Sequence, residues 1–96
     1  MKSLFALVGM KHRGTEALVA SLPQGEPLEL IREPTNQFDP NAIKVFARGQ
    51  HVGYIAAKQA KPLAVKIDRQ DNASVKILPA RLAIDGGRWP MCEVEE

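Results

Sequence analysis

The sequence contains one cysteine, Cys92, so it cannot form an internal disulfide and offers no cysteine pair at metal-ligand spacing. No apolar run approaches the ~20 residues that a membrane-spanning helix needs. The opening MKSLFALVGMK imitates a signal peptide, but its apolar run is short and no small-residue cleavage site follows. We therefore expect a cytoplasmic protein in a reducing environment, without a membrane segment.

Motifs that carry catalysis are also missing. There is no Gly-x-Ser-x-Gly elbow, no phosphate-binding lysine loop and no His-Glu-x-x-His motif. His12 and His51 are far apart, and neither has a cysteine or carboxylate at ligand spacing, so we interpret both as surface histidines. Asp39 with Asn41 lacks the acidic series of a calcium loop. The sequence predicts no catalytic residues, no metal site and no cofactor.

Charge is distributed unevenly along the chain. The 96 residues, 45% of them hydrophobic and 25% charged, have the composition of one soluble globular domain over residues 1–96. Residues 44–81 hold eight basic and two acidic side chains, a balance of +6, between segments with balances of −1 and −3. A basic stretch suits a phosphate-binding surface, but it also suits an ordinary solvated face. Charge alone leaves both interpretations open.

Hydrophobic periodicity predicts the order β-α-β-β-β-α-β-β. The expected strands are residues 4–10, 27–33, 41–48, 51–55, 73–84 and 89–94, and the expected helices are residues 15–22 and 56–69. Thr15 is the expected N-cap of the first helix. In the second helical segment Pro62 either kinks one helix or opens a second one, and we favour the second.

Glycine and proline positions predict the irregular points of the strands. Gly49-Gln50 is the expected hairpin turn, and Gly53 indicates a bulge or a close backbone approach. In residues 73–84 the inward parity switches between Ile77 and Leu82, so we expect a bulge near Pro79. Residues 85–87 are an expected turn.

Short strands joined by tight turns predict a mainly β (α+β) fold. We expect a small, partly open barrel of the OB-like or SH3-like kind, with about six strands and two helical insertions. A parallel α/β sheet is excluded because three consecutive strands are joined by hairpin-length turns.

The turn between the second and third expected strands, residues 34–40, has more polar and aromatic side chains than a simple reversal of the chain requires. It places Asn36, Phe38, Asp39 and Asn41 together, bracketed by two prolines. Prolines fix the backbone and short polar side chains bond to it, so the turn is expected to hold one shape. Asp39 is expected to cap the turn by accepting backbone N–H bonds, which does not exclude a second role. Rigidly held loops are common sites of binding residues.

Aromatic side chains beside cations give a second candidate surface. Alternation puts Lys44, Phe46 and Arg48 on the outer face of one strand. Bases stack on such rings while cations follow the phosphates of a single strand. The alternative is that the helix after Ala56 covers Phe46. For Phe38 and Tyr54, too, the sequence leaves open whether the ring is exposed to a ligand or covered by another element.

The string REPTNQFDPNAIKV, followed by HVGYI and preceded by LVGMKHRG, resembles the HIRAN domain signature. HIRAN domains occur alone in bacteria and phages, and at the N-terminus of SNF2-type repair translocases of the helicase-like transcription factor group. The resemblance covers roughly residues 5–89. It implies an OB-like barrel with helical insertions, in agreement with the strand pattern.

The resemblance also implies a socket for the 3′ end of single-stranded DNA. In DNA-binding members an Asn-x-aromatic-Asp turn and a basic-aromatic stretch surround the terminal nucleotides, with the carboxylate on the 3′-hydroxyl. The turn matches here as Asn36, Phe38 and Asp39. The first stretch matches as Lys11, but His12 and Arg13 stand where those members have aromatics. Trp89 is the expected later aromatic of the socket. The differences at His12 and Arg13 argue more against recognition of a 3′ end than against DNA binding itself.

Three functions remain distinguishable. The first is a non-catalytic module for single-stranded DNA or DNA ends, serving repair, replication or recombination beside a separately encoded helicase, nuclease or other repair protein. The second is an adaptor that binds a protein or peptide, because small barrels host many functions. The weakest is a nuclease using Asp39 and Glu33 with a divalent ion, because the sequence supplies no base and no further ligand.

Overall fold

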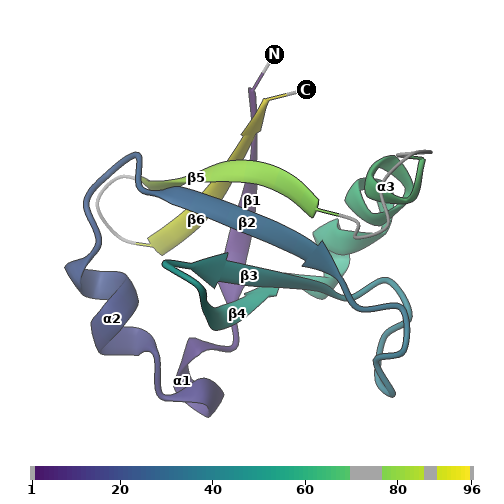
Figure 1. Cartoon of the computed structure of the whole chain (residues 1–96), viewed down its shortest axis with the longest axis horizontal. Helices are drawn as coiled ribbons and strands as arrows, with labels where there is room; N and C mark the ends of the chain where they lie inside the picture. The colour runs from purple at the N-terminus through teal and green to yellow at the C-terminus, as the bar shows by residue number, and fades with distance from the viewer. Residues whose placement is uncertain (1, 70–76, 86–88, 96) are drawn as a thin grey trace.

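The computed structural model describes residues 2–69, 77–85 and 89–95 (Figure 1). Within them the chain forms six strands and three helices. The elements are β1 (Lys2–Val8), α1 (Met10–Arg13), α2 (Glu16–Ser21), β2 (Pro27–Arg32), β3 (Ile43–Ala47), β4 (Gln50–Ile55), α3 (Ala57–Asp68), β5 (Ile77–Asp85) and β6 (Trp89–Glu95). All six predicted strands are present, and the fold is mainly β, as expected.

The strands form a closed barrel in the order β1-β4-β3-β2-β5-β6, and every ladder is antiparallel. β1 closes the ring because it pairs with β6 from Lys2↔Glu95 to Ala6↔Met91 and with β4 at Leu7↔Ile55. The predicted small OB-like barrel is confirmed, and the ring of strands is complete. Its interior holds the apolar side chains of alternate strand positions, among them Leu7, Leu28, Leu30, Ile43, Val45, Val52, Leu82, Cys92 and Val94.

The β3–β4 hairpin turns one residue earlier than predicted. The two turn residues are Arg48, with φ 53°, and Gly49, with φ 78°, while Gln50 already pairs with Ala47. A two-residue hairpin turn of this type needs two positive φ angles, and glycine supplies one of them without strain. Arg48 therefore lies in the turn and not on the outer face of the strand.

Gly53 combines both features that the sequence indicated. The β3–β4 register shifts beside it, because Val45 pairs with Gly53 and Phe46 with His51, so Val52 is the extra residue of a bulge. A Cβ atom on Gly53 would lie 2.5 Å from the carbonyl oxygen of Val8. Only glycine fits at this approach between β1 and β4.

The bulge predicted near Pro79 is wrong. β5 keeps one register with β2 from Ile77 to Arg81 and one register with β6 from Arg81 to Asp85. Leu82 exchanges backbone bonds with residues 25 and 26 before β2, so alternate β5 residues, including Pro79, direct their N–H positions away from β2. Pro79 therefore removes no β2–β5 bond. Val75 and the turn at Gly86-Gly87 lie outside the described residues.

Helix α3 runs through Pro62 without a break, so the predicted division into two helices is wrong. Its buried side chains are Ala60, Leu63, Ala64 and Ile67, at the spacing of one helical face. Packing of that face compensates for the backbone hydrogen bond that the proline removes. Pro62 itself is exposed.

The first strand ends earlier than predicted, and an additional short helix follows it. Met10 begins α1 and is buried, so it satisfies the apolar pattern without belonging to the strand. Thr15 precedes α2 as expected, but its side chain accepts no N–H of that helix, and its hydroxyl donates instead to the carbonyl of Val52. Thr15 is 3% exposed, and this bond ties the two helices to the bulge of β4. α1 and α2 lie together at one end of the barrel (Figure 1).

Candidate nucleic-acid interface

Residues 33–42, which we call the β2–β3 loop, extend beyond the barrel on the side away from α2 (Figure 1). The Oδ1 atom of Asn36 accepts the backbone N–H groups of Phe38 and Asp39, each at 2.9 Å. Oδ1 of Asp39 accepts the N–H of Asn41 at 2.9 Å, and the Asp39 carbonyl accepts the N–H of Ala42 at 3.0 Å. Asp39 thus caps the turn as predicted, and the loop holds itself in one shape.

The loop and the barrel enclose a hollow of about 380 Å³, which we call the loop hollow. Asn36, Phe38, Asp39 and Tyr54 all line it, so the structure brings four predicted site residues together. Val8, Ala42, Ile55 and Ala57 complete the lining. The Phe38 side chain is 95% exposed, whereas the loop around it is hydrogen-bonded. The hollow therefore has an apolar floor, a carboxylate and a solvent-facing ring.

Glu33 connects the loop to the strands beside the hollow. Its Oε1 atom accepts hydrogen bonds from Nδ2 of Asn36 at 2.6 Å and from the Tyr54 hydroxyl at 2.9 Å. Its Oε2 atom pairs with Nζ of Lys44 at 3.1 Å. Burial raises the pKa of Glu33, but these hydrogen bonds and the Lys44 charge outweigh it and hold the pKa below 4.5. The Glu33 carboxylate is therefore ionised at neutral pH.

An aromatic row follows β3 and β4 away from the loop hollow. His51 stacks on Phe46 with ring centroids 5.2 Å apart, and the rings of His51 and Tyr54 form a T-shaped pair with centroids 5.0 Å apart. Burial and the positive charges of Arg13 and Lys44 lower the pKa of His51 below 6.5, against the effect of its bond to the Gly53 carbonyl. His51 is thus a neutral, half-buried ring at pH 7, not a freely exposed surface histidine.

The predicted surface of Lys44, Phe46 and Arg48 does not form one cationic strip. Lys44 pairs with Glu33, Phe46 stacks on His51, and Arg48 pairs with Glu26 at 3.1 Å from its place in the hairpin turn. Arg48 lies at the end of β3 opposite the β2–β3 loop. The ring that covers Phe46 is that of His51, a contact not anticipated from the sequence.

The predicted site residues after β1 lie on α1 and are exposed: Lys11, His12 and Arg13. Nε of Arg13 donates to the carbonyl of His51 at 3.0 Å, which joins α1 to the aromatic row. Trp89, by contrast, lines a different hollow with Met10, Val19, Ile84 and Pro90. Its indole N–H donates to the carbonyl of Leu7 at 3.0 Å. The structure thus separates Trp89 from the loop hollow.

Two features of this surface were not singled out from the sequence. Glu33 is the first: the sequence offered it only as a metal ligand in the nuclease hypothesis, and its partners Lys44 and Tyr54 meet it only once the strands are paired. The second is the start of α3, where Ala57 lines the loop hollow and the next two lysines, Lys58 and Lys61, are exposed. Their signal in the sequence was the basic balance of residues 44–81, which does not say where the lysines lie.

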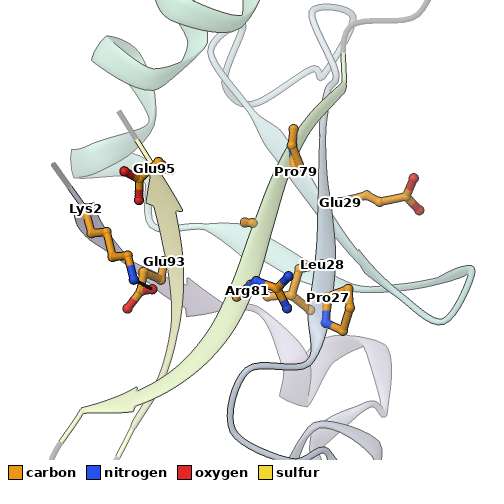
Figure 2. Close-up of a pocket in the computed structure, with 9 residues that line it drawn as sticks. Lys2, Pro27, Leu28, Glu29, Pro79, Arg81, Glu93 and Glu95 are labelled. Atoms are coloured by element: carbon orange, nitrogen blue, oxygen red, sulfur yellow. Dashed lines mark ion pairs between the residues drawn. The ribbon is translucent and has the colours of Figure 1, made fainter.

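A further hollow, of about 660 Å³, contains none of the predicted site residues (Figure 2). It lies where the β5–β6 ladder stops at Arg81↔Glu93, since Pro79 has no N–H to continue the ladder. Lys2 and Glu93 form an ion pair at 3.6 Å on one side, and the Glu29 carboxylate points outward from β2 on the other. Its charges are mixed, which does not favour phosphates.

Within the described ranges, no three His, Cys, Asp or Glu side chains are grouped so that they could hold a metal ion. Nor does any helix in this part of the chain have the length and apolarity to cross a membrane.

The fold and the loop agree with what comparison of the sequence finds. The model of the HIRAN domain family matches residues 3–84. The chain belongs to the HIRAN domain family. HIRAN domains bind DNA and occur in repair nucleases and helicases. A Fanconi-associated nuclease 1 homolog from Oryza sativa subsp. japonica is 42% identical over 52 residues, which are 50% of this chain.

This chain spans only 5% of the length of the rice protein, so the word nuclease in that name describes a much larger chain. A crystal structure of a protein from Lactobacillus plantarum is similar over nearly the whole HIRAN domain. It has a TM-score of 0.70 and 26% sequence identity, and the match covers 97% of this chain and 95% of that one. The barrel described above is therefore shared with an experimentally determined structure.

Proposed function

We propose that this HIRAN domain binds single-stranded DNA and takes the terminal nucleotide of a 3′ end into the loop hollow. The observation that carries the proposal is the convergence of Phe38, Asp39 and Tyr54 on that hollow, with Phe38 95% exposed. Stacking of a base on an aromatic ring contributes about 1–3 kcal/mol and tolerates any base sequence. A ring held out into solvent by a fixed loop is available for such a contact.

Asp39 supports recognition of a terminal hydroxyl. Among the residues that the structure describes, the Asp39 side chain accepts one hydrogen bond, from the backbone N–H of Asn41 to Oδ1, and a carboxylate has about four lone-pair sites. The carboxylate thus has capacity to accept a hydrogen bond from a 3′-hydroxyl while it continues to cap the turn. A terminal phosphate at the same place would bring two anions together.

Exposed cations of α1 and α3 supply the phosphate contacts in this proposal. Lys11 and Arg13 of α1 follow the lining residue Val8 in the chain, and Lys58 and Lys61 of α3 follow the lining residue Ala57. Lys44 and Arg48 are not among these contacts, because each already pairs with a carboxylate. The domain acts without catalysis and positions a separately encoded helicase, nuclease or other repair protein on the DNA.

The experiment is a titration of 5′-labelled oligonucleotides, followed by fluorescence anisotropy over a range of salt concentrations. Three single strands are compared, ending in a 3′-hydroxyl, in a 3′-phosphate, or in a 3′-hydroxyl with an added 5′-phosphate. We expect the 3′-phosphate strand to bind worst and the 5′-phosphate to change little. In Asp39→Asn, which keeps the turn-capping oxygen and loses the charge, the two 3′ ends should bind more alike.

Binding that is the same for both 3′ ends would remove end recognition and leave general single-strand binding. No binding to any single strand at ~50 mM salt, where phosphate contacts are strong, would contradict the proposal as a whole. A protein or peptide ligand would then be the better account.

A further inference from the structure

We propose that Glu33 is the positioning residue of the loop hollow, because its carboxylate accepts hydrogen bonds both from Asn36 of the β2–β3 loop and from Tyr54 on β4. The proposal deepens the function proposed above and rests on it for its effect on DNA. Glu33 itself does not line the hollow. It acts through two residues that do, Asn36 and Tyr54.

Backbone hydrogen bonds fix the position of Glu33. Its N–H donates to the carbonyl of Ala42 at 3.0 Å, and its own carbonyl accepts the N–H of Asn36 at 3.1 Å. The two ends of the loop are thereby joined at the point where Glu33 leaves β2. A single oxygen, Oε1, then accepts both the Asn36 amide at 2.6 Å and the Tyr54 hydroxyl at 2.9 Å.

These bonds determine what the two hollow residues offer to a ligand. Asn36 uses Oδ1 on two backbone N–H groups and Nδ2 on Glu33, so it shapes the loop and does not read the ligand. Tyr54 gives its only hydroxyl proton to Glu33. It therefore presents its ring face and oxygen lone pairs to the hollow, and no donor. A ring held in place in this way loses less freedom when a base stacks on it.

The charges around Tyr54 come from three elements. Glu33 follows β2, Lys44 lies opposite Tyr54 on β3, and Arg13 extends from α1, while the neutral ring of His51 meets Tyr54 edge-on. Burial, the hydrogen bond to Glu33 and the Glu33 charge raise the pKa of Tyr54 above 10, and Arg13 and the Asn36 side chain oppose this. Tyr54 is the only tyrosine of the chain, so its titration is observed without overlap from another tyrosine.

The test compares Glu33 with Glu29, an exposed carboxylate on β2 that lies outside the loop hollow. Replacing either glutamate with alanine removes one negative charge, which by itself favours the binding of DNA. We expect Glu33→Ala to bind a 3′-hydroxyl single strand about tenfold more weakly, whereas Glu29→Ala binds as well as or better than the unmodified protein. Glu33→Gln retains an Oε1 acceptor for Asn36 and Tyr54, so we expect it to restore most of the affinity.

The second readout needs no DNA. In the free proteins, ultraviolet absorbance of the phenolate follows the ionisation of Tyr54. We expect the Tyr54 pKa to fall from the unmodified protein to Glu33→Gln and again to Glu33→Ala, with no change in Glu29→Gln. If Glu33→Ala does not fold, Glu33→Gln alone decides, and an unchanged Tyr54 pKa overturns the proposal.

The two readouts separate this proposal from the proposed function. Equal DNA affinity of Glu33→Ala and Glu29→Ala, with the unmodified protein binding normally, overturns positioning while DNA binding stands. If the unmodified protein binds no single strand, the proposed function fails, and the titration still decides whether Glu33 holds Tyr54.

Discussion

The guanidinium of Arg32 forms a paired contact with the carboxylate of Asp68, Nε to Oδ1 at 3.0 Å and Nη2 to Oδ2 at 3.2 Å. The third nitrogen, Nη1, donates to the carbonyl of Ala42 at 2.9 Å. One side chain therefore links the end of α3, the end of β2 and the end of the β2–β3 loop. The Arg32 side chain is only 7% exposed, so its charge depends on these partners.

We expect Asp68→Ala to lower the free energy of unfolding by about 1–2 kcal/mol, because a nearly buried guanidinium loses its anion. Asp68 is half exposed, and solvent screening keeps the effect at the lower end of what buried pairs show. Urea unfolding measures the change. Glu29→Ala is the control and should cost less than about 0.5 kcal/mol, as exposed substitutions usually do. Equal stability of the two variants would show that the Arg32–Asp68 contact contributes nothing.

The approach of β4 to β1 gives the second prediction. Gly53→Val should destabilise the fold by about 1–3 kcal/mol, because the new Cβ would meet the Val8 carbonyl and the Leu7 side chain, and the backbone atom cannot move aside. Thermal unfolding checks this, with Ala17→Val on the exposed part of α2 as a control for the added volume. A Gly53→Val protein as stable as its control would refute this account of the β1–β4 contact.

Glu33 gives the domain a specific dependence on acid. Its folded-state pKa lies below the ordinary value of 4.5, so the unfolded chain binds its proton more readily. The stability due to Glu33 is therefore fully present above pH 4.5 and is lost as the pH falls through the folded-state pKa. We expect the free energy of unfolding to fall less between pH 7 and pH 3 in Glu33→Gln than in the unmodified protein. Parallel curves would show that Glu33 titrates alike in both states.

The buried thiol reports closure of the barrel. Cys92 is fully buried on β6, and burial raises its pKa to about 12. Since the thiolate is the reactive species, we expect no reaction with a thiol-specific disulfide reagent in the native protein at pH 8. One thiol should react after unfolding in guanidinium. Rapid labelling of the native protein would mean that β6 opens frequently from β1 and β5.

The sequence was sufficient for the strands and for the β2–β3 loop because both depend on local rules. Apolar runs and alternation located the strands, and the bonds from Asn36 and Asp39 reach only two or three residues along the chain. The errors arose where local signals are ambiguous. Met10 is buried whether it continues a strand or begins a helix, and Pro79 is compatible with a regular ladder when its missing N–H faces away from the partner strand.

The rest of the candidate site depends on strand pairing. Glu33 meets Tyr54, 21 residues away, only because β2, β3 and β4 pair in one register. Lys44 and Arg48 read as free cations in the sequence, but their carboxylate partners come from other elements. No periodicity reports such contacts. The same limit applies to Trp89, which the resemblance placed in the socket and the structure places in another hollow.

Salt dependence distinguishes the two groups of cations. We expect Lys58→Ala with Lys61→Ala to reduce the slope of log K against log salt by about 0.7 for each phosphate that the variant no longer neutralises. Arg48→Ala is the matched control and should leave the slope unchanged, because Arg48 pairs with Glu26 at the far end of β3. A reduced slope for Arg48→Ala alone would move the DNA path from the loop hollow to the hairpin.

The central claim is that DNA binds at the loop hollow through Phe38, and the most direct test is the affinity of Phe38→Ala for a 3′-hydroxyl single strand. The ring is 95% exposed, so its removal should leave the unfolding free energy nearly unchanged. We predict an affinity about 5- to 150-fold weaker, with Val65→Ala on the exposed face of α3 binding like the unmodified protein. Unchanged affinity in a folded Phe38→Ala protein would contradict the account.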